Sequence, residues 1–464
     1  MTVPVLNRKD YGRPAAPVRI VHIGLGNFTR AHQAWYTEHA SDAKDWGIAA
    51  FTGRRPTMAE LLTPQDGLYT LITKGTDGDS YEVISSVSEI HPASEFDKLI
   101  GFFANPNVVI VTSTVTEAGY CRAADGSLDK ASQAVAADLE VAKKAFADGV
   151  PSVEQIGKLE VSTAPVKVML GIAARMVADA GKLTVLPCDN IPNNGEGFNR
   201  VVRDAAEAVS SEVVAWLDAN TTWATCMVDR ITPATTDEEI AEVEAEQGYK
   251  DASPVPTEPF REWVISGEFP GGCPDWESAG AQIVDAVEPY EERKLWMLNG
   301  SHTLMAYVGP LKGCETVADA ITHPEVRPLV LEWWKEAGSG LSIDWEDYTK
   351  QLIERFENPN IRHLLSQIAA DGSQKIPVRT VPTIRRYRKA GEMPEAAVAV
   401  VAAWVLHLRG ASTPVKDAAA ESLKGLVGGS LEDDAVQVLK YLGEDLAADQ
   451  ELVDAVIAQA KALS

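Results

Sequence analysis

Residues 18–36, VRIVHIGLGNFTRAHQAWY, decide the fold of the first half of this chain. The β-branched run Val18–Ile23 predicts a buried strand, and a helix is expected to run on from Arg30. Between them, Gly24 and Gly26 form a GxG turn. Because glycine has no Cβ, such a turn lets the backbone approach a pyrophosphate, whose charge a helix N-terminus favours. The order of strand, turn and helix therefore favours a dinucleotide site.

The sequence around this turn leaves two questions open. Thr29 stands where the generic GxGxxG fingerprint has its third glycine, so a plain tight turn would look the same. Most NAD sites place an acidic side chain at the end of the second strand, whereas this chain has Arg54 and Arg55 there. Arginine can pair with the 2'-phosphate of NADP, but solvated surface arginines are an equal alternative.

Further β-branched runs alternate with helical stretches over the first 230 residues. The other predicted strands are Gly47–Thr52, Val108–Thr112, Leu183–Leu186 and Thr225–Val228. Apolar residues at helical spacing lie between them, among them Leu139, Ala142 and Phe146, and Val166, Leu170, Ile172 and Ala173. This rhythm is typical of an α/β fold with a mostly parallel, doubly wound sheet and crossover helices.

The second half of the chain has a different pattern. From Thr235 to about Pro274 the sequence is acidic and rich in turn residues, which indicates a surface excursion rather than a strand of the central sheet. Beyond Glu288 strand-like alternation almost vanishes, and apolar residues recur at helical spacing. We therefore predict two domains, a dinucleotide-binding α/β domain over 1–285 and a mainly α-helical domain over 286–464.

The composition indicates which binding partners and which cellular compartment to expect for this protein. The 464 residues carry 42 Lys and Arg against 67 Asp and Glu, a net charge of −25, which disfavours nucleic acid and anionic membranes. Five scattered cysteines without a CxxC pair predict a reducing compartment and no zinc site. No apolar signal segment is present, and the longest apolar run, Ala396–Leu406, is too short to cross a bilayer. We expect a cytoplasmic protein, monomeric or a small homo-oligomer.

Residues 289–313, PYEERKLWMLNGSHTLMAYVGPLKG, bring together polar groups suited to proton transfer. At about 100° per residue, Lys294, His302 and Asn299 fall near 0°, 80° and 140° on a helix, so they can share one broad face. A buried lysine has a lowered pKa and can take the proton of a hydroxyl, while the amide and imidazole orient and polarise the oxygen. Glu291, one turn earlier, can pass protons to water. A merely structural helix is the alternative.

Other polar segments follow apolar ones. Asn190 ends the fourth predicted strand, at the edge where open α/β sheets bind ligands, and can act with Asn299 on a substrate oxygen. MVDRITPAT (227–235) and DGSQKIPVRTVPTI (371–384) are comparable, although each by itself is as compatible with a loop. Gly300 would cost about 1 kcal/mol in a helix interior, which predicts that another group approaches the backbone there.

Together these segments resemble the polyol-specific long-chain dehydrogenase family, which contains mannitol 2-dehydrogenase, D-arabinitol dehydrogenase and fructuronate reductase. The resemblance spans nearly the whole chain and rests, in order, on HIGLGNFTRAHQAWY, QDGLYTL, TVTEAGYC, CDNIPNNG, MVDRITP, KLWMLNGSH, DGSQKIP and VPTI. It implies an N-terminal Rossmann-like domain, a mainly helical C-terminal domain, an active site between them and no metal. The implied reaction interconverts a polyol and a ketose with NAD(P), or reduces a hexuronate such as fructuronate or tagaturonate.

The resemblance also implies individual roles. Lys294, Asn299 and His302 match the family signature KxxxxNxxH, which makes Lys294 the general acid/base and His302 the group that positions substrate and lysine. Asn190 acts with Asn299 to polarise the reacting oxygen, and Glu291 gates proton exchange. The implied substrate contacts are Asp229 and Lys375. The expected cofactor contacts are Gly24, Gly26, Asn27, Phe28, Arg30, Arg54, Thr116 and Glu117.

Two departures and two rival interpretations accompany this resemblance. Gln367 replaces an arginine found shortly before DGS in mannitol 2-dehydrogenases, which is closer to fructuronate reductases, and the acidic residues after the second strand are absent. NAD is expected from the family, with NADP as the alternative. Tyr290 and Lys294, with Ser278 upstream, also form the YxxxK pattern of short-chain dehydrogenases, although they lie after the sheet should be complete. A catalytically silent dinucleotide sensor is the rival from another class.

Overall fold

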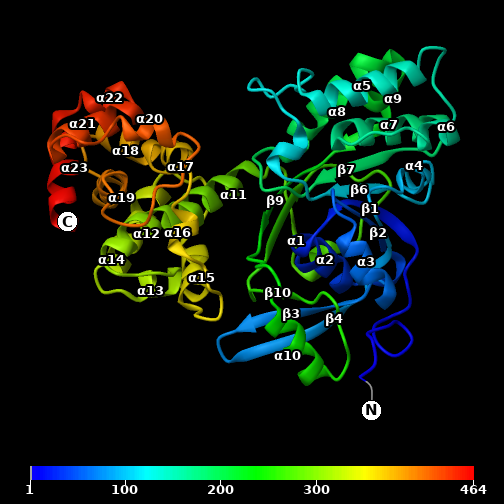
Figure 1. The fold of residues 1–464 in the computed structure, drawn as a ribbon, viewed down its shortest axis with the longest axis horizontal. Coiled ribbons are helices and arrows are strands. Elements are labelled where there is room, and N and C mark those ends of the chain that lie inside the picture. The colour runs from blue at the N-terminus through cyan, green and yellow to red at the C-terminus, as the bar shows by residue number, and fades with distance from the viewer. Residues whose placement is uncertain (1–2) are drawn as a thin grey trace. The chain divides into compact units, whose positions relative to one another are not determined.

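The structure is a computed structural model that describes residues 3–464. The chain forms two compact units, Met1–Glu288 and Pro289–Ser464 (Figure 1). Within the described range, none of the helices combines the length and the apolar character that crossing a membrane requires.

The first unit is built on a six-stranded parallel sheet. Its strand order is β5 (Val87–His91), β2 (Gly47–Thr52), β1 (Val18–Leu25), β6 (Ile110–Ser113), β7 (Leu183–Pro187) and β8 (Thr221–Trp223). The chain winds outward from β1 in one direction through β2 and β5, and in the other through β6, β7 and β8. Such a reversal opens a crevice at the carboxyl ends of the central strands, where open α/β sheets bind ligands.

Helices cover both faces of this sheet, because alternate strand residues point to opposite sides. In β1, Val21 and Ile23 belong to one core cluster, whereas Ile20 belongs to the other, together with Trp35 of α2 (Gln33–His39). The first cluster draws on α4 (Phe96–Phe103), α5 (Gln133–Ala145), α7 (Ala164–Val177), α8 (Asn194–Val209) and α9 (Ser211–Asn220), which Figure 1 shows beside β6 and β7. The doubly wound arrangement and the predicted crossover helices are therefore confirmed.

Two three-stranded sheets complete the first unit. One contains β10 (Val255–Thr257), β3 (Tyr69–Gly75) and β4 (Gly78–Ile84), and the other contains β12 (Gln282–Ile283), β11 (Glu262–Ser266) and β9 (Thr225–Asp229). The remaining helices of this unit are α1 (Asn27–Ala31), α3 (Thr57–Leu62), α6 (Val153–Gly157) and α10 (Asp237–Gln247).

One expectation about this region was wrong and another was right only in part. Thr225–Val228 does not extend the parallel sheet, since β9 pairs antiparallel with β11 and the sheet edge is β8 instead. The stretch 235–274 adds no strand to the central sheet, as expected, but it is more than a surface excursion, because it contributes α10, β10 and β11 and buries Trp263 completely. Local sequence favours a strand without specifying its partner, since pairing depends on distant contacts.

The second unit is helical, as predicted. Its helix α19 (Glu395–Leu408) buries every residue from Ala396 to His407, which explains the long apolar run, and packs against α12 (Gly300–Leu311), α14 (Val326–Gly338) and α23 (Gln450–Leu463). The other helices are α11 (Glu288–Arg293), α13 (Val317–Thr322), α15 (Glu346–Glu357), α16 (Leu365–Ile368), α17 (Gly372–Arg379), α18 (Val381–Lys389), α20 (Ala420–Lys424), α21 (Leu431–Leu442) and α22 (Glu444–Ala447).

Candidate active site

The GxG turn follows β1 at the point where the sheet reverses. Gly24 has a φ of +105°, and a Cβ at this position would lie 2.3 Å from the carbonyl oxygen of Thr114. Gly26 is extended and precedes α1, and a Cβ built on it meets no atom closer than the carbonyl oxygen of Gly24 at 3.8 Å. The first glycine is therefore required by the fold, whereas the second leaves open space in which a pyrophosphate could approach the backbone.

Thr29, which replaces the third glycine, is tied into the protein interior. Its hydroxyl lies 2.5 Å from the Thr114 hydroxyl and 2.8 Å from Nε2 of His22, whose Nδ1 lies 2.8 Å from the hydroxyl of Thr112. Burial lowers the pKa of His22 to about 3, so the ring is neutral. The network fixes the turn against the end of β6, which explains why a threonine is compatible with this glycine-rich turn.

Arg30 holds the same turn from the other side. This fully buried side chain donates from Nη2 to Oδ1 of Asn27 (2.7 Å), from Nε to the carbonyl oxygen of Gly26 (3.3 Å), and from Nη1 to that of Ser253 (2.5 Å). Burial lowers the pKa of Arg30 to about 10. Asn27 in turn donates to the Pro233 carbonyl, at 3.1 Å. Arg30 thus stabilises the turn by donating hydrogen bonds to oxygen atoms of the protein.

The other predicted cofactor contacts lie in neighbouring segments of the same unit. Phe28 of α1 stacks on His32, with ring centroids 5.0 Å apart. Thr116 directly precedes a short 3₁₀ helix, and exposed Glu117 begins it and pairs with Arg122 at 3.5 Å. Arg54 follows β2 and is exposed. Burial raises the pKa of the Cys121 thiol, and the positive charge of Arg54 opposes this rise. Arg54 therefore lies near the loop that follows β6.

Asp189, which was not among the predicted site residues, is a buried hub just after β7. Its carboxylate accepts hydrogen bonds from the Val115 amide (2.5 Å), the Tyr120 hydroxyl (2.8 Å) and the Ser113 hydroxyl (3.1 Å). Burial raises the pKa of Asp189 to about 7, although these three donors act in the opposite direction. The hub joins the end of β7 to residues 113–120, and the next residue, Asn190, is exposed.

Asp229 also lies at a strand end, as the last residue of β9, and is buried. The adjacent Arg230 donates from Nε to the Glu258 carbonyl (3.2 Å) and from Nη1 to the Ala31 carbonyl (2.5 Å). Burial lowers the pKa of Arg230 to about 10. The arginine thus connects the end of β9 with the end of α1, a link that no local pattern could have indicated.

In the second unit, Lys294 and Asn299 are the first and last residues of a π-helical stretch, which leads directly into α12. The expected spacing of 140° assumed an α-helix and is wrong here. In a π-helix residue i bonds to residue i+5, so side chains five apart lie one turn apart on nearly the same face. Lys294 is 9% exposed and His302, on α12, is 8% exposed. The His302 ring packs 5.0 Å from Phe356 and 5.0 Å from His363.

Gly300 separates the π-helical stretch from α12. A Cβ at this position would lie 2.5 Å from the ring of Trp333, a fully buried residue of α14. The expected close approach to this glycine is thus confirmed, and the approaching group is an indole of the protein itself.

The remaining predicted residues lie on neighbouring helices of the second unit. Glu291 belongs to α11, one turn before Lys294, and Gln367 belongs to α16. Lys375, on α17, donates from Nζ to the Ile368 carbonyl at 2.9 Å. Burial and the charge of Arg379 lower the pKa of Lys375, while two aspartates oppose this shift.

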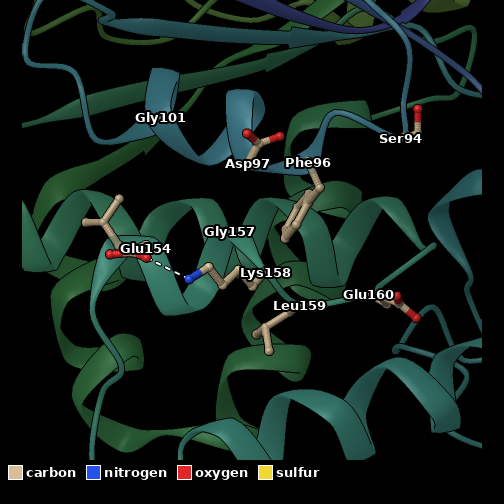
Figure 2. A pocket seen from close by; sticks show the side chains of 10 residues that line it. Ser94, Phe96, Asp97, Gly101, Glu154, Gly157, Lys158, Leu159 and Glu160 are labelled. Carbon is tan, nitrogen blue, oxygen red and sulfur yellow. Dashed lines mark hydrogen bonds and ion pairs between the residues drawn. The ribbon is translucent and has the colours of Figure 1, made fainter.

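Two further observations add nothing to the candidate site. Among residues 3–464, no three His, Cys, Asp or Glu side chains gather as a metal site would require. A groove between α4 and α6, shown in Figure 2, is lined by residues that include Phe96, Asp97 and Glu160, and its Lys158 already pairs with Glu154 at 2.6 Å. It contains none of the predicted site residues.

A doubly wound sheet with a glycine turn at its switch point, here followed by a helical unit, is the fold of dinucleotide-binding domains. Residues 18–278 match the mannitol dehydrogenase Rossmann domain, and residues 286–464 match the mannitol dehydrogenase C-terminal domain. The chain therefore belongs to the mannitol dehydrogenase family of oxidoreductases, which excludes the short-chain dehydrogenase interpretation. In keeping with this, the Ser278 hydroxyl serves a turn, where it donates to the Asp275 carbonyl at 2.6 Å.

Individual relatives agree with this assignment. The chain is 36% identical to D-mannonate oxidoreductase of Escherichia coli K12, over 94% of this chain and 93% of that protein. It is 34% identical to mannitol 2-dehydrogenase of Pyrenophora tritici-repentis, over 96% and 79%. The structure of Pseudomonas fluorescens mannitol 2-dehydrogenase with NAD and D-mannitol superimposes with a TM-score of 0.76, at 32% identity, over 97% and 92% of the two chains.

Proposed function

We propose that this protein catalyses reversible hydride transfer between NAD and a secondary alcohol carbon of an open-chain polyol, with Lys294 as acid and base. NAD supplies the hydride acceptor, C4 of its nicotinamide ring. During oxidation the hydroxyl proton of the substrate passes to Nζ of Lys294, and during ketone reduction it returns. The observation that carries the proposal is the burial of Lys294 one π-helical turn from Asn299.

The other residues assist this proton transfer. The carboxamides of Asn299 and Asn190 donate to the reacting oxygen, where negative charge develops. His302 orients the substrate and the lysine, and Glu291 passes the proton between Lys294 and water. Gly24 and Gly26 shape the turn that receives the pyrophosphate, and the requirement for NAD is supported by the complex of the Pseudomonas fluorescens relative.

A second substrate class, the hexuronates, is favoured by a specific observation. Lys375 and Arg379 lie one helical turn apart on α17, both partly buried, and each carries a positive charge. A substrate carboxylate would neutralise the charge of Lys375, whereas a neutral polyol would not. Gln367 and the similarity to D-mannonate oxidoreductase support the same candidate.

The test of the proposed function is a screen of the purified protein with NADH and NADPH. The substrates are fructose, xylulose, fructuronate and tagaturonate. We expect turnover with at least one of them and no loss of activity after treatment with a metal chelator. If dinucleotide binds but no substrate of either class turns over, the result contradicts the proposed function and favours the sensor interpretation.

Replacing Lys375 by Met is expected to separate the two substrate classes. If a carboxylate binds at α17, KM for a hexuronate should rise at least about tenfold, because a charge-assisted hydrogen bond is lost. KM for a ketose should change about threefold or less. Steady-state kinetics with both substrates provide the measurement, and an equal change for both would argue against carboxylate binding by this lysine.

Replacing Arg54 by Ala tests the cofactor preference. If the guanidinium beyond β2 contacts the 2'-phosphate, kcat/KM for NADPH should fall about tenfold or more, since an ion-paired hydrogen bond is lost. The value for NADH should change about threefold or less. Arg55→Ala serves as the neighbouring comparison, and parallel losses with both cofactors would show that Arg54 does not select between them.

A further inference from the structure

The π-helical stretch Lys294–Asn299 has an unusual set of hydrogen-bond donors around its backbone. Three of its carbonyl oxygens, those of Trp296, Met297 and Asn299, accept hydrogen bonds from side chains. An i→i+5 pattern is rare and is found where the ordinary i→i+4 ladder is interrupted by other donors. The stretch therefore depends on groups outside its own helix.

Two of these donors are adjacent indoles of α14. Nε1 of Trp333 donates to the Trp296 carbonyl at 2.8 Å, and Nε1 of Trp334 lies 3.1 Å from the Met297 carbonyl and 2.6 Å from the hydroxyl of Ser301. Both rings are buried, at 0% and 2% exposure. Since a buried indole N–H needs an acceptor, Trp333 is held to the Trp296 carbonyl, and Trp334 is held to the Ser301 hydroxyl, which itself donates to the Met297 carbonyl.

The third donor is Arg379, at the end of α17. Its Nη1 lies 3.2 Å from the Asn299 carbonyl and 3.1 Å from the hydroxyl of Thr303, which itself donates to the same carbonyl at 3.0 Å. Burial lowers the pKa of Arg379 to about 10, at which the side chain is still a cation at neutral pH. A charge-assisted hydrogen bond thus fixes the backbone of Asn299, the residue that ends the stretch.

We propose that Trp333, Trp334 and Arg379 form a carbonyl clamp that holds the stretch in its π-helical form and so sets the side chains of Lys294 and Asn299 on one face. Without the clamp the segment would relax toward an α-helix, in which these two residues lie about 140° apart. The three donors are positioning residues, since they act through the backbone. The effect on turnover rests on the proposed function, whereas the effect on the backbone does not.

The test compares Arg379→Met with Arg379→Lys and with the matched control Arg385→Met. Arg385 lies on the adjacent helix α18 and pairs at the surface with Asp445, at 2.8 Å. We expect Arg379→Met to lower kcat about 10- to 100-fold, as small misplacements of reacting groups do, with KM for NAD within about threefold. Arg379→Lys should recover most of kcat. Amide hydrogen exchange over residues 294–303 should accelerate in Arg379→Met alone.

Trp334→Phe keeps an aromatic ring but removes the indole N–H, so it provides a second variant should Arg379→Met fold poorly. The clamp is refuted if Arg379→Met or Trp334→Phe leaves hydrogen exchange over residues 294–303 at the rate of the unmodified protein. It is also refuted if exchange accelerates while kcat matches that of Arg385→Met. If the unmodified protein has no activity, the proposed function fails, but the exchange measurement still decides whether the clamp exists.

Discussion

Lys294→Ala is expected to lower kcat/KM for alcohol oxidation by about 10³- to 10⁴-fold, the upper range for loss of a general acid/base. This corresponds to about 4–5 kcal/mol of transition-state stabilisation. The effect should be large because the amine is buried, so water cannot readily replace it as the proton acceptor. Steady-state kinetics at saturating NAD provide the measurement.

The pH dependence of the two reaction directions tests the same role of Lys294. If Lys294 is the base, alcohol oxidation needs its neutral amine and should rise with pH as the lysine loses its proton. Ketone reduction needs the ammonium form and should fall through the same range. In Lys294→Ala both profiles should flatten. Lys350→Ala is the control, because that lysine of α15 is exposed and pairs with Asp347 at the surface, at 2.6 Å. An unchanged rate in Lys294→Ala would exclude the lysine as the base.

Gly24→Ala is expected to lower the free energy of unfolding by about 2–6 kcal/mol. The φ of +105° is strained for any residue with a Cβ, which costs about 1–3 kcal/mol, and the 2.3 Å approach to the Thr114 carbonyl adds an overpacking cost of about the same size. The backbone carbonyl cannot move aside as a flexible side chain could. Denaturant unfolding measures the loss of stability, and titration with NAD should show binding weakened at least about tenfold.

Gly26→Ala separates the two roles of the turn. Its Cβ would meet no atom closer than 3.8 Å, so stability should stay within about 1 kcal/mol, whereas the methyl group would occupy space proposed for the pyrophosphate. NAD affinity should therefore fall while the unfolding curve barely shifts. Gly101→Ala on α4, where a Cβ would meet nothing within 4 Å, is the control for both measurements. Unaltered NAD affinity in Gly26→Ala would show that the pyrophosphate does not approach this turn.

The sequence predicted most of the first unit because its strands and crossover helices are local signals. The β-branched runs gave β1, β2, β6 and β7, and helical spacing gave α5 and α7. The strands β3, β4, β5 and β8 were missed; β4 is largely polar and β8 has three residues, so neither shows a clear apolar alternation. The sheet to which β9 belongs could not be predicted, because pairing is decided by the partner β11, more than thirty residues later.

The side chains of the candidate site, like the strands, were predicted from the sequence only in part. The spacing of Lys294, Asn299 and His302 selected these residues as candidates, whereas Asp189 was not selected. Its importance arises from donors on Val115, Tyr120 and Ser113, which lie about seventy residues away in the chain. A buried carboxylate with three donors cannot be distinguished from an exposed one by its neighbours in sequence.

The sequence by itself determined the parallel sheet, the GxG turn after β1, the helical second unit and the identity of the residues in the KxxxxNxxH segment, because each depends on residues within about one element of each other. Only the tertiary structure decided the π-helical geometry of Lys294–Asn299 and the anchoring of the turn by Arg30. Both depend on hydrogen bonds between groups far apart in the chain, from α14 and α17 to the π-helical stretch and from Arg30 to the carbonyl of Ser253. Such bonds form only once packing has brought those elements together.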